Sequence, residues 1–191
     1  MKRIPSFCVD HTKLQPGIYT SRIDDDIITY DIRMKKPNVP PFLPTASMHT
    51  IEHLFATISR NSEYEHKIIY FGPMGCRTGF YFLVRDMKPE DAIALIQRIM
   101  TDIANYEGEI PGNTAVECGN YLEHDLEDAK NQIQKANKLI GLSEVTGPGV
   151  TITLTDSKID ASSVIDASSL IVHNLDIYYI INELKNAGAE A

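Results

Sequence analysis

The sequence predicts an α+β fold in which helices pack on one face of an antiparallel or mixed sheet. Apolar residues make up 43% of the 191 residues, which is enough to build a hydrophobic core. Three segments repeat apolar residues with helical period, and short runs rich in β-branched and aromatic residues lie between them. The expected order is strands, helix, two strands, helix, strand and helix, which favours helices layered on a single sheet.

The strands are predicted from residue type and from the turns that separate them. One or two strands are expected among residues 4–33. Residues 67–72 (KIIYFG) and 79–84 (GFYFLV) are expected to form two strands joined by the turn-forming segment PMGCRT, which contains Cys76. A further short strand is expected at residues 115–118 (AVEC).

Helical periodicity predicts three amphipathic helices. The first covers residues 48–61, with Ser47 or Thr45 available to cap its start. The second opens at Pro89, since proline is tolerated in the first turn of a helix. The third follows Asp125 as its cap and ends at Gly141. The apolar positions of the three patterns are Ile51, Leu54, Phe55 and Ile58, then Ala92, Ile93, Ile96, Ile99, Met100 and Ile103, then Leu126, Ala129, Ile133, Ala136 and Ile140.

A change in composition predicts a domain boundary after residue 142. Residues 143–191 hold seven acidic and two basic side chains, so this acidic tail carries −5 of the net charge of −8. Residues 143–169 are dense in Ser, Thr, Gly and Asp and contain no aromatic residue, as expected of a linker. We therefore expect a main domain at residues 1–142 and a partial domain at residues 143–191.

Net charge limits the classes of partner, and the number of cysteines indicates how their thiols are used. Eighteen Lys and Arg against 26 Asp and Glu give a net charge of −8, which argues against nucleic acid and anionic membranes as partners. No apolar segment approaches the ~18 residues that span a bilayer, and the first residues lack a secretory signal, so a cytoplasmic location is expected. Cys8, Cys76 and Cys118 are odd in number and far apart, which favours reduced thiols used for metal binding or catalysis.

The sharpest motif is HTIEH, which places His49 and His53 four residues apart on the first predicted helix. Both imidazoles then project from one face of the helix and can bind a single metal ion. Glu52 lies beside them, three residues after His49. The motif therefore predicts a metal site with a carboxylate next to it.

A catalytic metal needs a third protein ligand and an open position for water or substrate. The candidates for the third ligand are Cys118, Glu117, His124 and Cys76. We favour Cys118, because Gly119 after it allows a sharp bend that turns the thiolate toward the helix. A set of two histidines and one cysteine suits iron(II) or zinc, and the sequence does not separate these metals.

Cys76 is expected to transfer protons. It lies in a loop with Gly and Pro next to Arg77, where a cation and backbone N–H groups favour a thiolate. Together with Glu52 it gives two groups that move protons around a Lewis-acidic metal. Such a site suits removal of a proton from carbon next to a carbonyl.

Several longer motifs resemble the S-ribosylhomocysteine lyase family, whose enzymes produce the precursor of autoinducer-2. They are PSFCVDHTK, YDIRM, HTIEHLFA, PMGCRTGFY and ECGNYLEHDL, in this order, and they cover about residues 3–141. The resemblance implies a homodimer with two sites at its interface, each holding a divalent metal, natively Fe2+, which Zn2+ or Co2+ replaces in preparations. The matching positions are His49, His53 and Cys118 for the metal, Cys76 and Glu52 for catalysis, and Ser6, His11 and Arg33 for the substrate pocket.

The resemblance also implies a reaction. The carbonyl of S-ribosylhomocysteine moves from C1 to C2 and then to C3 by proton transfers shared between Cys76 and Glu52. Elimination then releases homocysteine and 4,5-dihydroxy-2,3-pentanedione without a redox cofactor, which connects the enzyme to homocysteine recycling and quorum sensing. Many members carry Asp six residues before the loop cysteine, where this chain has Tyr70. That departure puts one hydrogen bond of the pocket in doubt.

The acidic tail resembles part of another domain, one of unknown function encoded near division genes in Gram-positive bacteria. The resemblance implies a strand within VTGPGVTITLTDS and a helix within LIVHNLDIYYIINELKNAGAEA. His173 is expected to be a polar residue before the helix cap and not a metal ligand. The helix is supported by Asn174 as cap, by Gly188 as stop, and by the apolar stripe Ile177, Ile180, Ile181 and Leu184.

Two other functions stay open. The H-x-x-E-H pattern is also the motif of inverted zinc peptidases, in which the glutamate activates water for hydrolysis. Their third ligand is a glutamate, whereas Cys118 is favoured here. The second alternative is a non-enzymatic protein in which the main domain is a dimeric scaffold for the tail.

Overall fold

In the computed structural model, the described residues are 7–141, 149, 151–158, 171–172, 177, 180–181 and 184. The chain divides into two compact units, Met1–Ser143 and Glu144–Ala191. The first unit contains every helix and strand that positions the candidate site.

The first unit is built on a four-stranded sheet in the order β1-β2-β4-β3. The strands are β1 (Gly17–Asp24), β2 (Ile27–Arg33), β3 (Ile68–Pro73) and β4 (Gly79–Arg85). All neighbouring pairs are antiparallel. The two strands predicted on either side of PMGCRT are confirmed. Residues 4–33, where one or two strands were expected, contain two.

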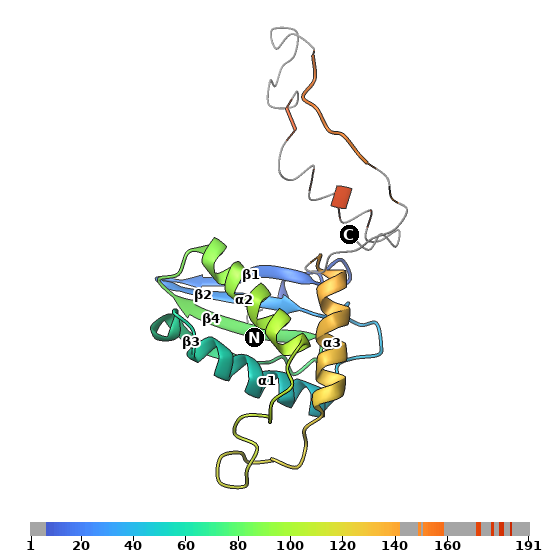
Figure 1. Ribbon diagram of the computed structural model, residues 1–191. Helices are drawn as coiled ribbons and strands as arrows, with labels where there is room; N and C mark the ends of the chain where they lie inside the picture. The colour runs from blue at the N-terminus through green and yellow to red at the C-terminus, as the bar shows by residue number, and fades with distance from the viewer. Residues whose placement is uncertain are drawn as a thin grey trace. The chain divides into compact units, whose positions relative to one another are not determined.

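Helices α1 (Thr45–Arg60), α2 (Pro89–Ala104) and α3 (Leu126–Leu139) lie on one face of this sheet (Figure 1). Each helix contacts the other two, and α1 also packs against β3. The short 3-10 helix η2 (Glu65–Lys67) precedes β3. This arrangement confirms the predicted α+β class with helices on one side of an antiparallel sheet.

The register of β2 against β4 decides which side chains enter the core. Tyr30 is opposite Phe82 and Ile32 is opposite Phe80, so these alternate residues share the face toward the helices. Aromatic stacking continues the core onto α1, with side-chain ring centroids of Phe55 and Phe71 3.8 Å apart. Large side chains that are almost fully buried include Tyr30, Phe55, Phe80, Phe82, Met34, Leu43, Ile51, Leu54, Leu95, Ile96, Ile99 and Met100.

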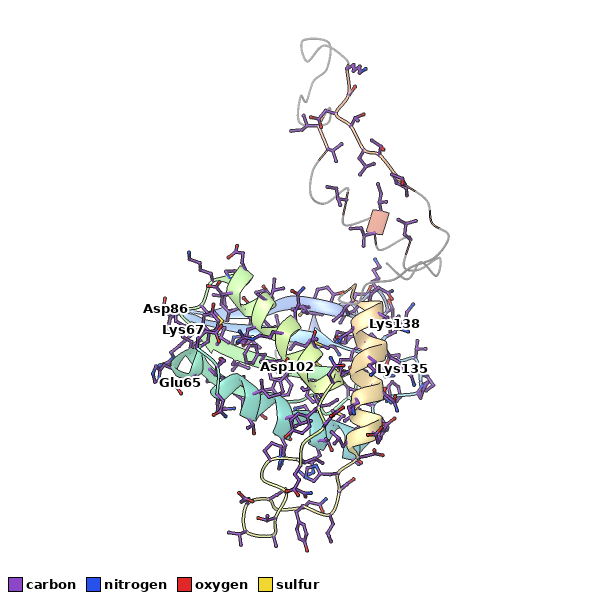
Figure 2. All side chains as sticks on the ribbon, viewed as in Figure 1. Glu65, Lys67, Asp86, Asp102, Lys135 and Lys138 are labelled. Atoms are coloured by element: carbon purple, nitrogen blue, oxygen red, sulfur yellow. The ribbon has the colours of Figure 1, made fainter. Side chains whose placement is uncertain are left out.

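Several charged side chains lie at the periphery of the first unit. Lys67 and Asp86 lie together at one end of the sheet, with Nζ 3.6 Å from the carboxylate (Figure 2). Arg98 donates two hydrogen bonds to the carboxylate of Glu63, which lower the pKa of Glu63 to about 2. Exposed ion pairs contribute little to the free energy of unfolding, so the stability of the fold comes mainly from the hydrophobic core.

Three of the predicted helix signals are present as expected. Asp125 caps α3 and accepts a hydrogen bond from the backbone N–H of Asp128 at 2.9 Å. Gly141 follows α3 with φ of +76°, a conformation that favours glycine and ends the helix. Pro89 opens α2, where its missing N–H leaves no hydrogen bond unmade.

The predicted cap of the first helix is wrong. The cap position is Pro44, which has no side chain to accept a hydrogen bond. Thr45 donates its hydroxyl proton to Glu123 at 2.6 Å, and Ser47 donates to Asp128. These two carboxylates are 78 and 81 residues further along the chain, so the two hydroxyls form tertiary contacts instead of local ones.

The short strand predicted at residues 115–118 is also wrong, because these residues form turns. The backbone N–H groups of Glu117 and Cys118 donate to the carbonyl of Thr114 at 3.1 and 2.9 Å. Val116 is 97% exposed. Without a neighbouring strand edge to pair with, this short apolar run has no reason to extend.

The second unit shows part of what the resemblance of the tail implies. Residues 151–158 have no regular secondary structure, so the implied strand is not formed there, in keeping with the instability of a strand without partners. The backbone N–H of Val172 donates to Asp156 Oδ1 at 2.7 Å. The expected cap Asn174, the expected stop Gly188 and His173 lie outside the described residues. The positions of the expected apolar stripe are helical, namely Ile177, Ile180, Ile181 and Leu184.

The buried helix layer generates a stability prediction. Leu95 is 2% exposed in α2, whereas Leu122 is 80% exposed in the connection before α3. Leu95→Ala should lower the free energy of unfolding by about 2–5 kcal/mol, because it leaves a cavity in the core. The matched change Leu122→Ala should stay within about 0.5 kcal/mol of the unchanged protein. Urea unfolding of the metal-free proteins measures both, and equal effects would contradict the packing described.

Candidate metal centre

The first turns of α1 bring two imidazoles together. His49 and His53 lie one turn apart, with ring centroids 4.6 Å from each other. The helix buries Ile51, Leu54 and Phe55 on another face, against the sheet and the other helices. Because the apolar face fixes the rotation of α1, the two histidines face the connection between α2 and α3.

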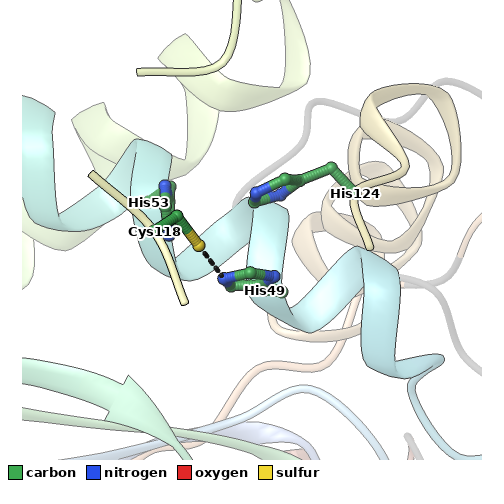
Figure 3. A group of neighbouring side chains, drawn as sticks. All are labelled: His49, His53, Cys118 and His124. Atoms are coloured by element: carbon green, nitrogen blue, oxygen red, sulfur yellow. Dashed lines mark hydrogen bonds between the residues drawn. The ribbon is translucent and has the colours of Figure 1, made fainter. Parts of the chain in front are cut away.

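That connection, residues 105–125, supplies the other donors. The Sγ atom of Cys118 lies 3.3 Å from Nε2 of His49. His124 joins the same cluster, and the donor atoms of all four residues lie within 4.8 Å of one another (Figure 3). Two nitrogen donors and a thiol sulfur at this separation can hold one metal ion.

The connection is held on α1 by side-chain hydrogen bonds. Glu123 accepts a hydrogen bond from Thr45 and another from Asn120, both at 2.6 Å, and the bond from Thr45 is the main cause of its lowered pKa. The backbone N–H of Asp125 donates to Thr50 Oγ1 at 2.9 Å. These bonds hold the chain directly after Cys118 on α1, so the sulfur is brought to the helix by tertiary contacts.

Two of the imidazoles are oriented by backbone carbonyls. The Nδ1 atom of His49 lies 3.0 Å from the carbonyl oxygen of Glu123, and Nδ1 of His53 lies 2.8 Å from that of Pro111. A carbonyl only accepts, so each Nδ1 carries the proton and each Nε2 keeps its lone pair. Metal-binding histidines are commonly held in this way. The donor set therefore fits a divalent metal.

His124 is the donor that sequence reasoning set aside in favour of Cys118. Its Nε2 atom is buried and has no hydrogen-bond partner among the described residues. Burial is the main reason that the pKa of His124 falls to about 4, and His49 and His53 lower it further. The His124 ring stacks on His49 with centroids 4.1 Å apart and an angle of 19° between the planes.

The other candidates for the third ligand lie outside the cluster. Glu117 accepts a hydrogen bond from Thr114 Oγ1 at 2.6 Å and does not join the cluster. Cys76 belongs to a different group of side chains. Glu52 is half-buried on α1 beside the cluster and forms no hydrogen bond or ion pair with any described residue.

Cys76 lies in the loop between β3 and β4, next to a buried cation. Its sulfur is 3.7 Å from Nη1 of Arg33 and 3.0 Å from Oγ1 of Thr78. Arg33 is 3% exposed and forms two hydrogen bonds with the carboxylate of Asp31. The sequence suggested Arg77 as the nearby cation, but the described contacts of the sulfur are with Arg33 and Thr78. We name Cys76, Arg33, Thr78 and Asp31 the thiol group.

The thiol group lies on the sheet face opposite the helices. Asp31 pairs with Tyr81 across β2 and β4, in the register that alternates with the core residues. Burial raises the pKa of Asp31, and Arg33 and His11 oppose that rise. Burial also raises the pKa of Tyr81, with smaller contributions from Asp31 and Cys76. The predicted pocket residues His11 and Arg33 therefore act on the same carboxylate, whereas Ser6 lies outside the described residues.

Tyr70 extends along the same face of β3. A Cβ atom on Gly72 would lie 1.9 Å from the Tyr70 hydroxyl, so the ring occupies the space that glycine leaves free. Tyr70 is opposite Leu83, and Gly72 is opposite Tyr81. The departure from the family pattern thus places a phenol on the sheet face that carries the thiol group.

Within residues 7–141, no hydrogen bond, ion pair or ring contact joins the metal centre to the thiol group. A cavity of about 710 Å³ is lined by residues 108–114 with Glu117 and Leu126. It borders Pro111, which orients His53, but its lining includes neither Cys76 nor Glu52. This cavity is therefore not where the predicted catalytic groups meet.

The chain matches one enzyme family over most of its length. The family is S-ribosylhomocysteinase (LuxS), and the match covers residues 4–143. The chain belongs to the S-ribosylhomocysteinase (LuxS) family. The identification agrees with the resemblance found in the sequence motifs, and members of the family that have curated names are carbon–sulfur lyases.

Several curated relatives carry the name S-ribosylhomocysteine lyase. The relative from Borreliella burgdorferi is 50% identical over 141 residues, which are 71% of this chain and 90% of the relative. The relative from Finegoldia magna is 52% identical over 135 residues, 68% of this chain and 86% of the relative. The relative from Clostridium acetobutylicum is 47% identical over 146 residues, 73% of this chain and 92% of the relative.

The tail matches a second family. Residues 132–191 match a family described as bacterial protein of unknown function (DUF881). This confirms that the tail resembles a domain without known function, and the match begins inside α3. Among the residues placed by the structure, no helix is both long and apolar enough to cross a bilayer.

The geometry of the centre predicts the effect of removing one donor. His53→Ala should lose most bound metal, because one of the clustered nitrogen donors is gone. His66→Ala is the control, since that side chain is 90% exposed and outside the cluster. Metal analysis of the two purified variants measures the difference. Full occupancy in His53→Ala would remove His53 from the ligand set.

Proposed function

We propose that the protein cleaves S-ribosylhomocysteine to homocysteine and 4,5-dihydroxy-2,3-pentanedione, the precursor of autoinducer-2. Family membership and relatives with this activity in their names support the substrate and the reaction. The observation that carries the proposal within this chain is the donor cluster of His49, His53, Cys118 and His124, with Glu52 next to His53 on α1. The peptidase alternative is disfavoured, since Cys118 and not Glu117 lies with the two histidines.

His49, His53 and Cys118 would hold the divalent metal of the enzyme. When bound, such an ion supplies Lewis acidity, which makes a C–H group next to a carbonyl easier to deprotonate. We propose Fe2+ as the native metal, with Zn2+ or Co2+ as substitutes, because imidazole and thiolate donors suit all three. No other cofactor is required, because the proposed reaction only moves protons and breaks one carbon–sulfur bond.

The chain's own side chains perform the proton transfers. Two transfers move the carbonyl from C1 to C2 and then to C3, each taking a proton from one carbon and returning a proton to its neighbour. A third removes the proton next to the C3 carbonyl, and the carbon–sulfur bond breaks as homocysteine leaves with a proton. We assign these steps to Glu52, which lies next to His53 on α1, and to Cys76, whose sulfur lies beside Arg33 and Thr78.

Arg33 and Thr78 position the sulfur of Cys76 for this role. The guanidinium and the hydroxyl stand beside the sulfur at 3.7 and 3.0 Å and can stabilise negative charge there. Asp31 holds the guanidinium in place from the other side. Ser6, His11 and Arg33 are the proposed substrate-binding residues.

We propose further that a second copy of the chain covers the open face of the sheet. The helices cover only one face (Figure 1), and the other carries Tyr70, Leu83 and Tyr81 in addition to the thiol group. Tyr70 is 47% exposed in a single chain. A homodimer through this face would bury these side chains and close the pocket around the thiol group, which is consistent with sites at a subunit interface.

The chemistry of the proposed site and the charge of the chain support a location and exclude two classes of partner. Cys76 and Cys118 must stay reduced and ferrous iron must stay available, so we propose a cytoplasmic location. The net charge of −8 gives no basic surface for nucleic acid or an anionic membrane, and we propose neither as a partner. We propose that residues 1–142 are the catalytic domain and that residues 143–191 are an appended partial domain outside the reaction.

The proposed reaction predicts the behaviour of the catalytic variants. Purified protein should release free thiol from S-ribosylhomocysteine. Cys76→Ala should retain the metal, and its turnover rate should fall by a factor of about 10²–10⁴, because the change removes a proton-transfer group. Glu52→Gln should behave in the same way. A chromogenic thiol assay with parallel metal analysis measures both properties.

Each result in this experiment assigns a role. Cys8→Ala serves as the control for Cys76→Ala, because Cys8 is an exposed cysteine that is not itself assigned to the metal, to catalysis or to the substrate. Loss of metal from Cys76→Ala would make Cys76 a ligand instead. A protein that binds metal but releases no thiol would overturn the proposed activity.

The dimer proposal predicts a contrast between two faces. Leu83→Arg places a charge on the open sheet face, so this variant should sediment as a monomer with little activity. Leu139→Arg is the matched control, because Leu139 is 50% exposed at the end of α3 in the helix layer. Sedimentation velocity and the thiol assay measure the two effects. A dimeric, fully active Leu83→Arg protein would show that this face is not the interface.

The domain proposal predicts that the tail is dispensable for catalysis. Deletion of residues 144–191 should leave metal content and turnover nearly unchanged, because the proposed site residues precede residue 125 and α3 ends at Leu139. Metal analysis and the thiol assay on the truncated protein test this. If either property is lost, the tail contributes to the site and the boundary is misplaced.

A further inference from the structure

We propose that His124 binds substrate at the metal centre, with Nε2 accepting a hydrogen bond from the 2-hydroxyl of the sugar next to the carbonyl. The inference rests on the proposed function and adds a substrate-binding residue to it. It follows from the tautomer of His124, from the isolation of its lone pair, and from the angle between its ring and that of His49.

The hydrogen bonds of Thr50 fix the tautomer of His124. The Thr50 hydroxyl donates its single proton to the carbonyl of Ala46 at 2.9 Å. The same oxygen accepts from the backbone N–H of Asp125 at 2.9 Å. Its contact with Nδ1 of His124 at 3.2 Å is therefore a second accepted bond, and Nδ1 carries the proton. In the neutral ring, Nε2 is then an acceptor with a bare lone pair.

That lone pair has no donor in the protein. Nε2 of His124 is buried and accepts no hydrogen bond from any residue that the structure describes. Buried polar atoms in proteins normally have a partner. A ring nitrogen of His124 lies within 4.8 Å of the donor atoms of His49, His53 and Cys118, so a group bound in the centre can supply that partner.

The ring planes argue against direct ligation of the ion by His124. A metal ion lies close to the plane of each imidazole that binds it, along the nitrogen lone pair. The rings of His49 and His124 are stacked with centroids 4.1 Å apart and only 19° between their planes. One ion cannot lie near both planes at once. His53 meets His49 at 89°, which lets both of their lone pairs converge.

A hydroxyl donor on the substrate fits both observations. It would give Nε2 of His124 a partner, and it does not require His124 to bind the ion. The two α1 histidines and Cys118 would hold the ion, and a catalytic metal keeps a position for an exchangeable ligand. An α-hydroxy carbonyl carries an acceptor and, on the next carbon, a hydroxyl donor. The carbonyl oxygen suits the open position, and the adjacent hydroxyl suits a neutral acceptor beside it. The proposed substrate is of this chemical class when its sugar ring is open.

The first experiment counts the ligated histidines in the protein without substrate. In Co2+-loaded protein, each ligated imidazole gives a hyperfine-shifted N–H signal in proton NMR. Two such signals are expected, from His49 and His53, and they should persist in His124→Leu. A third signal that disappears in His124→Leu would make His124 a ligand and overturn the inference. Loss of cobalt from His124→Leu would overturn it as well.

The second experiment measures the substrate contact. His124→Leu should lower kcat/KM by roughly 10–100-fold, the range for residues that support a metal site from outside. His124→Gln keeps an acceptor oxygen and should recover most of that loss, and His66→Ala is the control. In a Cys76→Ala background, His124→Leu should weaken binding of S-ribosylhomocysteine but not of its 2-deoxy analogue, as followed by the Co2+ absorption spectrum.

The outcomes separate the inference from the proposed function. Equal kcat/KM in His124→Leu and the unchanged protein, or equal weakening for both ligands, would overturn the role of His124 while the lyase activity stands. Absence of thiol release from the unchanged metal-loaded protein would overturn the proposed function itself. Circular dichroism of His124→Leu shows whether any loss in this variant is measured on a folded protein.

Discussion

The hydroxyl of Thr50 is the contact on which the metal centre depends. It donates to Ala46 inside α1 and accepts from Asp125 and His124 at the far end of the connection between α2 and α3. A single side chain therefore joins the helix that carries two histidines to the segment that carries the other donors. Because a buried hydroxyl with three satisfied hydrogen bonds is costly to disturb, it fixes the separation of these two segments.

The sheet separates the metal centre from the thiol group. One face packs against α1, whose histidines belong to the metal centre, and the other carries Asp31 and Arg33 of the thiol group. Strand geometry produces this division, since alternate residues of β2 point to opposite faces. Tyr30 and Ile32 enter the core, so Asp31 and Arg33 must lie on the opposite face. The buried pair of Asp31 and Arg33 then holds a cation beside Cys76 without exposing it.

The pattern of the sequence was enough to predict most of the fold. Helices and strands with strong periodicity were located correctly, because the same apolar residues that create the pattern, such as Ile51 in α1 and Phe82 in β4, are those that the core buries. The errors concern short segments. The strand expected at residues 115–118 gave way to local turn hydrogen bonds to Thr114. The cap expected from Thr45 or Ser47 gave way to tertiary hydrogen bonds to Glu123 and Asp128.

The sequence by itself determined the helix spacing of His49 and His53, the family and the residue types available for chemistry. Those features depend on local geometry or on motifs that are contiguous in the chain. Only the tertiary structure decided that His124 joins the cluster and that Arg33, not Arg77, lies beside Cys76. Both depend on contacts between residues more than forty positions apart, which arise from how the connection and the sheet pack and which no local pattern encodes.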